Sequence, residues 1–173
     1  MRCFVALWPD KAAATSLAAL GIELCRPNQS ARPLAAEDLH LTLAFIGEIP
    51  DARARRLAAA IEDAFDGAPA WTVDRPGTFP RARVLWVAGA PAPALGALAD
   101  GVRSCLTQLG VPFDHKPFMP HLTLARAYRA AVDLPERLRS PIECRFDPPR
   151  LIRTRIDGPA ARYGRVEPER LLR

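Results

Sequence analysis

His40-Leu-Thr-Leu-Ala44 and His121-Leu-Thr-Leu-Ala125 are two copies of one pentapeptide, and they hold two of the three histidines in the chain. Random placement rarely produces such a repeat. Successive side chains of a strand alternate between its faces, so each copy sets its histidine and threonine on one face and its leucines on the other. The repeat therefore predicts two amphipathic strands that each present a His-x-Thr pair.

The segments that precede the two pentapeptides also match each other. Val5-Ala6, a helical pattern and His40 correspond to Val87-Ala88, a helical pattern and His121, at offsets of 82 and 81 residues. A duplicated unit is the economical explanation. A pseudo-two-fold relation between the copies predicts that the two histidine strands lie on opposite sides of one central groove.

Periodicity and capping signals divide the chain into strands and helices. Helices are predicted from Pro9-Asp10 to about Cys25, from Asp51 as N-cap to about Phe65, and over 93–109. A loop is predicted at 27–33, and strands at 2–8, 39–46, 70–75, 83–88, 121–127, 142–147, 149–156 and 161–166, the last after a turn at Asp157-Gly158. Strands interspersed with about three helices indicate an α+β fold.

Length and composition fit a globular protein with one core. The 173 residues are 49% hydrophobic, and the apolar run before Pro9 is too short for a secretory segment or a membrane span, so we expect a cytoplasmic protein with no membrane partner. The four cysteines form no C-x-x-C pair and are expected to be reduced and mostly buried. A net charge of +5 weakly favours an anionic partner.

Two histidines that face one phosphate suit acid–base cleavage of a phosphoester. Imidazole has an ordinary pKa near 6.5, so one ring can start neutral and the other protonated close to neutral pH. The hydroxyls of Thr42 and Thr123 can donate hydrogen bonds to phosphate oxygens. This arrangement requires no cofactor and no metal, and each strand offers only one metal ligand without a carboxylate or cysteine at close spacing.

The motifs extend beyond the pentapeptides. They comprise Phe4-Val-Ala-Leu-Trp-Pro-Asp10, Leu39-His-Leu-Thr-Leu-Ala-Phe-Ile-Gly47, Phe79-Pro-Arg-Ala-Arg-Val-Leu-Trp86, Pro117-Phe-Met-Pro-His-Leu-Thr-Leu-Ala-Arg126 and Ala161-Arg-Tyr163. With both His-x-Thr motifs intact, the sequence resembles the 2H phosphoesterase superfamily, and within it the RNA 2',3'-cyclic phosphodiesterase family, also called 2'-5' RNA ligases.

The resemblance implies both a fold and a reaction. The fold is a single domain over 1–173, made of two intertwined lobes whose two antiparallel sheets line a central cleft, with helices outside; a monomer is expected. The reaction opens a 2',3'-cyclic phosphate at an RNA end, or of a cyclic nucleotide, to a 2'-phosphate. His121 accepts the proton of water, His40 donates a proton to the leaving 3' oxygen, and 2'-5' ligation is the reverse reaction.

Two further side chains can be placed by alternation, and a third by its surroundings in the sequence. Arg126 matches a phosphate-binding position of the family, but strict alternation from His121 turns it to the opposite face unless the strand ends or bulges at Ala125. Alternation groups Phe45 with the leucines and predicts core packing for it, although base stacking is the alternative. His115 has no partner motif and is predicted to lie in a loop.

Two other functions fit the same residues. The first is an RNA-binding protein that recognises phosphorylated ends without turnover, although binding alone does not demand titratable residues in both copies. The second is a superfamily phosphodiesterase acting on 2'-5' oligoadenylate or on a cyclic phosphate of ADP-ribose. The structural alternative, two ordinary amphipathic strands, explains one copy more easily than an identical pair.

Overall fold

The computed structural model describes residues 1–129, 133–154 and 163–169 of the chain. Its helices are α1 (Lys11–Cys25), the short 3-10 helix η1 (Ala36–Asp38), α2 (Asp51–Ala64) and α3 (Pro93–Gln108). Its strands are β1 (Arg2–Leu7), β2 (Arg32–Pro33), β3 (Leu41–Glu48), β4 (Trp71–Phe79), β5 (Val84–Gly89), β6 (Leu122–Arg126), β7 (Ile142–Cys144), β8 (Arg150–Thr154) and β9 (Tyr163–Arg165). The predicted α+β class is confirmed.

The strands follow a symmetric order. Apart from β2, which pairs with β6, the antiparallel sheet runs β7-β4-β5-β6-β3-β1-β8-β9. The duplicated pairs β1–β3 and β5–β6 are therefore equivalent on either side of the β3–β6 seam. That seam consists of one register pair, Leu41 with Leu122, so the sheet bends there into two halves. The predicted pseudo-two-fold relation is confirmed.

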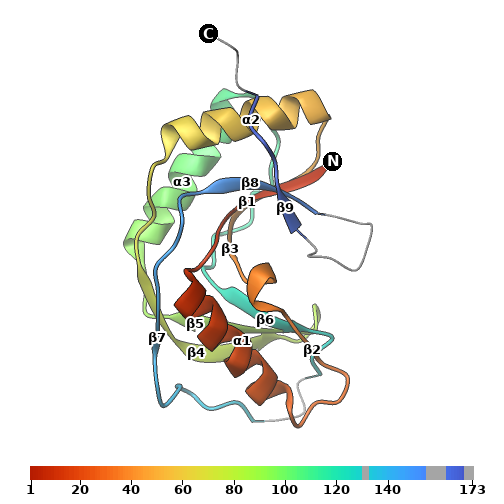
Figure 1. Ribbon diagram of the computed structural model, residues 1–173, viewed down its shortest axis with the longest axis vertical. Coiled ribbons are helices and arrows are strands. Elements are labelled where there is room, and N and C mark those ends of the chain that lie inside the picture. Colours follow the sequence, from red (N-terminus) through yellow and green to blue (C-terminus); the bar gives the residue numbers. More distant parts are fainter. Residues whose placement is uncertain (130–132, 155–162, 170–173) are drawn as a thin grey trace.

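Each duplicated helix packs against the histidine strand of the opposite half. Helix α1 follows β1 but contacts β6 and β7, whereas α3 follows β5 but contacts β3. Figure 1 shows α1 at one end of the molecule with β4, β5 and β6, and α2 and α3 at the other end with β1 and β8. Close packing of α1 on β6 depends on Gly21, because a Cβ there would lie 3.1 Å from the Leu124 carbonyl oxygen.

The capping signals place the helix ends close to their predicted positions. Asp10 caps α1 as expected, with its Oδ1 accepting a 2.8 Å hydrogen bond from the Ala13 N–H. Asp51 is the first residue of α2 rather than its N-cap, since Pro50 occupies the cap position. Helix α3 begins with Pro93, which needs no hydrogen-bond acceptor at that position.

The strand boundaries differ more from the prediction. Strand β4 continues past residue 75 through Pro76 and Gly77, which pair with Val87 and Trp86. Among the described residues, β7 pairs only with Trp71–Val73, so that side of β4 is unpaired at Pro76, where proline is tolerated. The predicted 27–33 loop contains the short strand β2, and β7 ends at Cys144. The predicted turn at Asp157-Gly158 lies outside the described residues.

One continuous hydrophobic core lies between the helices and the sheet. The leucines of both pentapeptides are at most 1% exposed, and Cys3, Cys25 and Cys144 are buried free thiols. Phe4, Ala6 and Ile152 form a smaller cluster on the other face of the sheet, the face that carries the candidate site. Among the described residues, no helix is long and apolar enough to cross a membrane.

Candidate active site

The two His-x-Thr pairs meet at the seam of the sheet. The antiparallel pairing of Leu41 with Leu122 aligns His40 with Thr123 and Thr42 with His121 across the two strands. All four side chains line one cleft of about 730 Å³. The structure therefore brings together, from both halves of the chain, the four polar side chains that the repeat singled out.

The two imidazoles are held in the same way. His40 Nδ1 lies 2.7 Å from the Asp38 carbonyl oxygen, and His121 Nδ1 lies 2.7 Å from the Met119 carbonyl oxygen. A carbonyl oxygen only accepts, so each Nδ1 is the donor and carries a hydrogen. The Nε2 atom of each neutral ring is therefore the basic nitrogen, and each ring can take up or release a proton there.

A bulge in each histidine strand turns one further side chain into the cleft, Phe45 in β3 and Arg126 in β6. Between Thr123 and Ala125 the pairing of β6 with β5 shifts by one residue, and β3 shifts likewise against β1 between Thr42 and Ala44. Arg126 therefore returns to the cleft face, as the bulged alternative for this residue required. Phe45, its counterpart in the first copy, also lines the cleft and is 56% exposed, so the prediction that it packs in the core is wrong.

Aromatic rings enclose His40 more closely than His121. The rings of Trp8, Phe4 and Tyr163 lie 4.9, 5.1 and 4.8 Å from that of His40. Burial lowers the pKa of His40 from 6.5 to about 4; the hydrogen bond to Asp38 opposes this shift, and the charges of Arg126 and His121 reinforce it.

His121 contacts the rings of Phe79 and Trp86, at 5.1 and 6.5 Å. Burial also lowers its pKa, against the effect of the hydrogen bond to the Met119 carbonyl. Both imidazoles of the free protein are therefore mainly neutral at pH 7.

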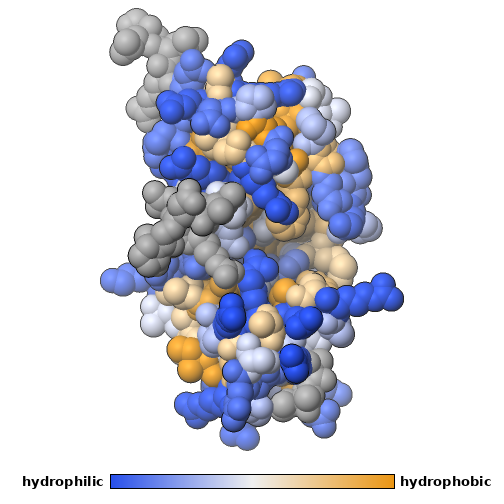
Figure 2. Space-filling model, turned by 90° about the vertical axis from the view of Figure 1, so that its right-hand side faces the viewer, coloured by the Kyte–Doolittle hydropathy of each residue, from blue (hydrophilic) through white to orange (hydrophobic). Residues whose placement is uncertain are grey.

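Figure 2 shows the surface hollowed between the upper and lower halves of the face it presents. The cleft is lined by side chains from both halves, including Arg2, Phe4, Asp114 and Tyr163 besides those already named. The predicted site omitted these four, because each is brought to the cleft by pairing between distant segments. His115 is exposed, as expected for a loop residue.

No group of three or more His, Cys, Asp or Glu side chains is placed to hold a metal ion in the part of the chain that the structure describes. His40 and His121 each have one ring nitrogen directed at a backbone carbonyl. Arg126 and Arg2 line the same cleft, and their positive charges suit an anionic ligand.

Known proteins match both the sequence and the fold. The family model for LigT-like phosphoesterases matches residues 7–86. The RNA 2',3'-cyclic phosphodiesterase of Escherichia coli is 36% identical over 110 residues, which cover 63% of this chain and 62% of that protein. The RNA 2',3'-cyclic phosphodiesterase of Thermus thermophilus is 32% identical over 150 residues, which cover 78% of this chain and 73% of that protein. The chain belongs to the LigT-like phosphoesterase family.

Comparison with solved structures shows that the similarity in fold covers nearly the whole of this chain. The crystal structure of Escherichia coli LigT complexed with 3'-AMP superposes with a TM-score of 0.77 at 27% identity, covering 95% of this chain and 94% of that one. The sequence match to the same organism's phosphodiesterase spans less than two thirds of that relative. The family resemblance is confirmed, and so is the implied α+β fold with two halves around a central cleft.

Proposed function

We propose that this LigT-like protein hydrolyses RNA 2',3'-cyclic phosphate ends, or 2',3'-cyclic nucleotides, to 2'-phosphates, with His40 and His121 as the acid–base pair and no metal. The observation that carries the proposal is that two imidazoles, each tied at Nδ1 to a backbone carbonyl, line one cleft. The curated relatives named as RNA 2',3'-cyclic phosphodiesterases support the choice of substrate.

The proposed reaction is an in-line displacement at phosphorus. His121 Nε2 takes a proton from water as the water oxygen bonds to the phosphorus atom. The bond from phosphorus to the 3' oxygen breaks, and His40 Nε2 gives its proton to that oxygen. The products are a 2'-phosphate and a 3'-hydroxyl, with His121 protonated and His40 neutral until solvent exchange restores the starting state.

The acid role of His40 depends on the bound substrate. Its pKa of about 4 in the free cleft leaves it mainly neutral at pH 7. A phosphate monoanion about 4 Å away stabilises an imidazolium by roughly 4 kcal/mol at an effective dielectric constant of 20. That is the energy of about three pKa units, enough to offset the effect of burial.

Three further side chains are proposed to hold the phosphate. The hydroxyls of Thr42 and Thr123 lie beside the imidazoles and donate to the non-bridging oxygens, and Arg126 supplies a fixed positive charge. The exposed ring of Phe45 offers a surface on which the terminal base can stack. Reversal of the same steps, with a 5'-hydroxyl in place of water, would join RNA ends through a 2'-5' bond.

The test is product analysis with an oligonucleotide that ends in a 2',3'-cyclic phosphate, in the presence of EDTA. The expected product carries a 2'-phosphate, and His40→Ala and His121→Ala each lose turnover while retaining their circular dichroism spectrum. His115→Ala is the matched control, because His115 is an exposed loop histidine outside the cleft.

Binding without turnover would favour the RNA-end-binding protein, and turnover confined to 2'-5' oligoadenylate or to an ADP-ribose cyclic phosphate would change the substrate. The monomeric state and cytoplasmic location remain predictions.

A further inference from the structure

Tyr163 connects the two halves of the cleft. Its ring packs edge-on against those of His40, at 4.8 Å, and Phe4, at 5.3 Å. Its hydroxyl oxygen accepts a 3.2 Å hydrogen bond from Nη2 of Arg126, on the opposite half of the sheet. A hydroxyl that accepts in this way keeps its own hydrogen for a further acceptor in the cleft. The position of Tyr163 therefore affects both the burial of His40 and the placement of Arg126.

The strand that carries Tyr163 has little support from the sheet. Within the residues that the structure describes, strand β9 is three residues long, lies at the end of the strand order and pairs only with β8. A strand this short gains little from backbone pairing alone. Contacts made by its other side chains must therefore hold it in place.

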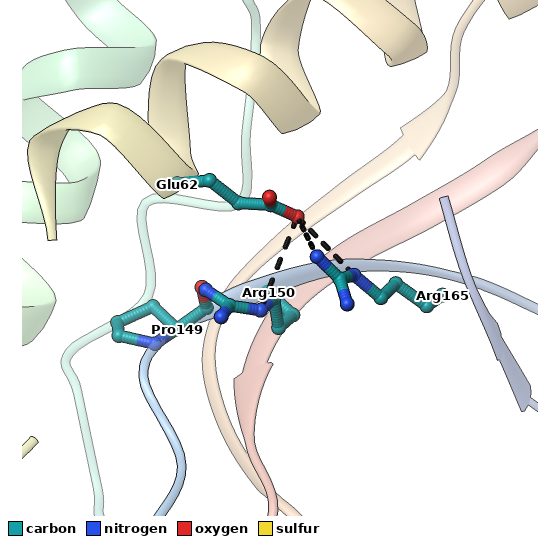
Figure 3. Close-up of polar contacts among 4 residues, drawn as sticks. All are labelled: Glu62, Pro149, Arg150 and Arg165. Carbon is teal, nitrogen blue, oxygen red and sulfur yellow. Dashed lines mark hydrogen bonds and ion pairs between the residues drawn. The ribbon is translucent and has the colours of Figure 1, made fainter. Parts of the chain in front are cut away.

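Glu62, on α2, supplies such a contact. Its Oε1 accepts hydrogen bonds from Arg165 of β9, at 2.6 Å from Nη2 and 3.2 Å from Nε, and lies 3.9 Å from Nε of Arg150 of β8. Figure 3 shows the two arginine side chains converging on one carboxylate oxygen of Glu62. The Glu62 side chain is only 18% exposed, which reduces screening by solvent. One carboxylate thus ties both β8 and β9 to α2.

We propose that Glu62 is a positioning residue of the cleft, which through Arg165 holds β9 so that Tyr163 stands between His40 and Arg126. The inference adds a role for α2, which contributes no side chain to the cleft lining. It rests on the proposed function only where turnover is the readout, because the enclosure of His40 by Tyr163 is measurable in the free protein.

The test compares Glu62→Ala with a matched variant, Asp74→Ala. Asp74 is a carboxylate of similar exposure, 15%, that also pairs with two arginines, Arg137 at 2.9 Å and Arg75 at 3.6 Å, but it does not line the cleft. Both variants lose one half-buried ion-pair network, so their melting temperatures should fall by similar amounts. Only the loss of Glu62 should change the cleft.

The deciding measurement is the titration of the His40 imidazole by NMR in the free protein. Among the described residues, the charges that act on His40 are those of Arg126 and His121, so an effect of Glu62 must pass through the placement of Tyr163 and Arg126. Glu62→Ala should raise the pKa of His40 by about one unit or more as the ring becomes more hydrated. Asp74→Ala should leave it unchanged.

Turnover gives a second readout. With a 2',3'-cyclic nucleotide, the pH optimum of kcat/KM should move upward in Glu62→Ala together with the pKa of His40, and stay in place in Asp74→Ala. Arg165→Gln removes the other partner of the Glu62–Arg165 ion pair. The double variant with Glu62→Ala should therefore shift the pKa of His40 and the pH optimum little more than either single variant does.

Each outcome bears on one proposal. If His40 titrates in Glu62→Ala as in the wild-type protein, the positioning role is wrong, whether or not the protein turns over substrate. If the wild-type protein binds but does not hydrolyse a cyclic phosphate, the proposed function fails, and the NMR titration still decides the role of Glu62. If Asp74→Ala shifts His40 as much as Glu62→Ala does, the effect is a general loss of stability and the positioning role is again wrong.

Discussion

The lowered pKa values of the two histidines predict separate pH optima for kcat/KM and for kcat. The first parameter reports the ionisation of the free protein, and the second that of the bound complex. In the productive form only one of the two histidines is protonated at Nε2. Each pH profile is therefore bell-shaped, with its maximum between the two apparent pKa values of the pair. The prediction is tested by varying the pH for the wild-type protein with a cyclic mononucleotide as substrate.

The structure sets the direction and the size of the effect. In the free cleft the pKa of His40 is about 4 and that of His121 is below its ordinary 6.5, so kcat/KM should be maximal below pH 6.5. Above the higher apparent pKa it should fall about tenfold per pH unit. A bound phosphate monoanion raises both pKa values, by up to about three units at about 4 Å, so the optimum of kcat should lie about one to three units higher.

The assay is steady-state hydrolysis between pH 4 and 9 with EDTA, with circular dichroism as a control for folding at each pH. A solvent isotope effect on kcat establishes that proton transfer limits the rate. Coincident optima, or a kcat/KM profile that is flat between pH 5 and 8, would contradict this prediction, because the cleft would then not control the ionisation of its histidines.

Five single substitutions give four further predictions. Replacing either His40 or His121 by Ala should lower kcat by about 10²–10⁴-fold with the fold retained, measured by single-turnover hydrolysis. Arg126→Lys should bind a 2'-nucleotide product more weakly, by about tenfold in calorimetry, because a lysine lacks the planar fork of donors. Thr42→Val should reduce kcat by about 10-fold or more and leave the melting temperature nearly unchanged, since it removes a donor to the transition state. Leu122→Ala, at the seam, should cost roughly 2–5 kcal/mol of unfolding free energy in urea titration, because Leu122 is fully buried.

The sequence predicts the polar centre of the site because its information there is local. Identical His-x-Thr pairs and simple alternation suffice to place four side chains on one face of two strands. Alternation fails just after Thr42 and Thr123, where each copy continues with Leu-Ala, two successive apolar residues. Both members of each pair are buried, and the pairing register shifts at each pair, so the bulge decides where Phe45 and Arg126 point.

The walls of the cleft depend on long-range pairing that no local pattern encodes. Tyr163 is brought near His40 by the pairing of β9 with β8 and of β8 with β1. Asp114 reaches the cleft because its N–H donates a 2.8 Å hydrogen bond to the Phe45 carbonyl oxygen. Helix ends, by contrast, follow from residues within one turn of them, such as Asp10, and were predicted to within one or two residues.

The single pairing of Leu41 with Leu122 has an evolutionary consequence. It places both histidines where the two halves of the sheet join, so the spacing of the proposed reacting groups is set by buried backbone. The other lining side chains come instead from β1, β9 and the segment before β6. They are the aromatic rings of Phe4 and Tyr163 and the charged rim formed by Arg2 and Asp114. Selection can therefore replace rim side chains and change the substrate of the proposed activity, while the buried frame keeps the two imidazoles preorganised.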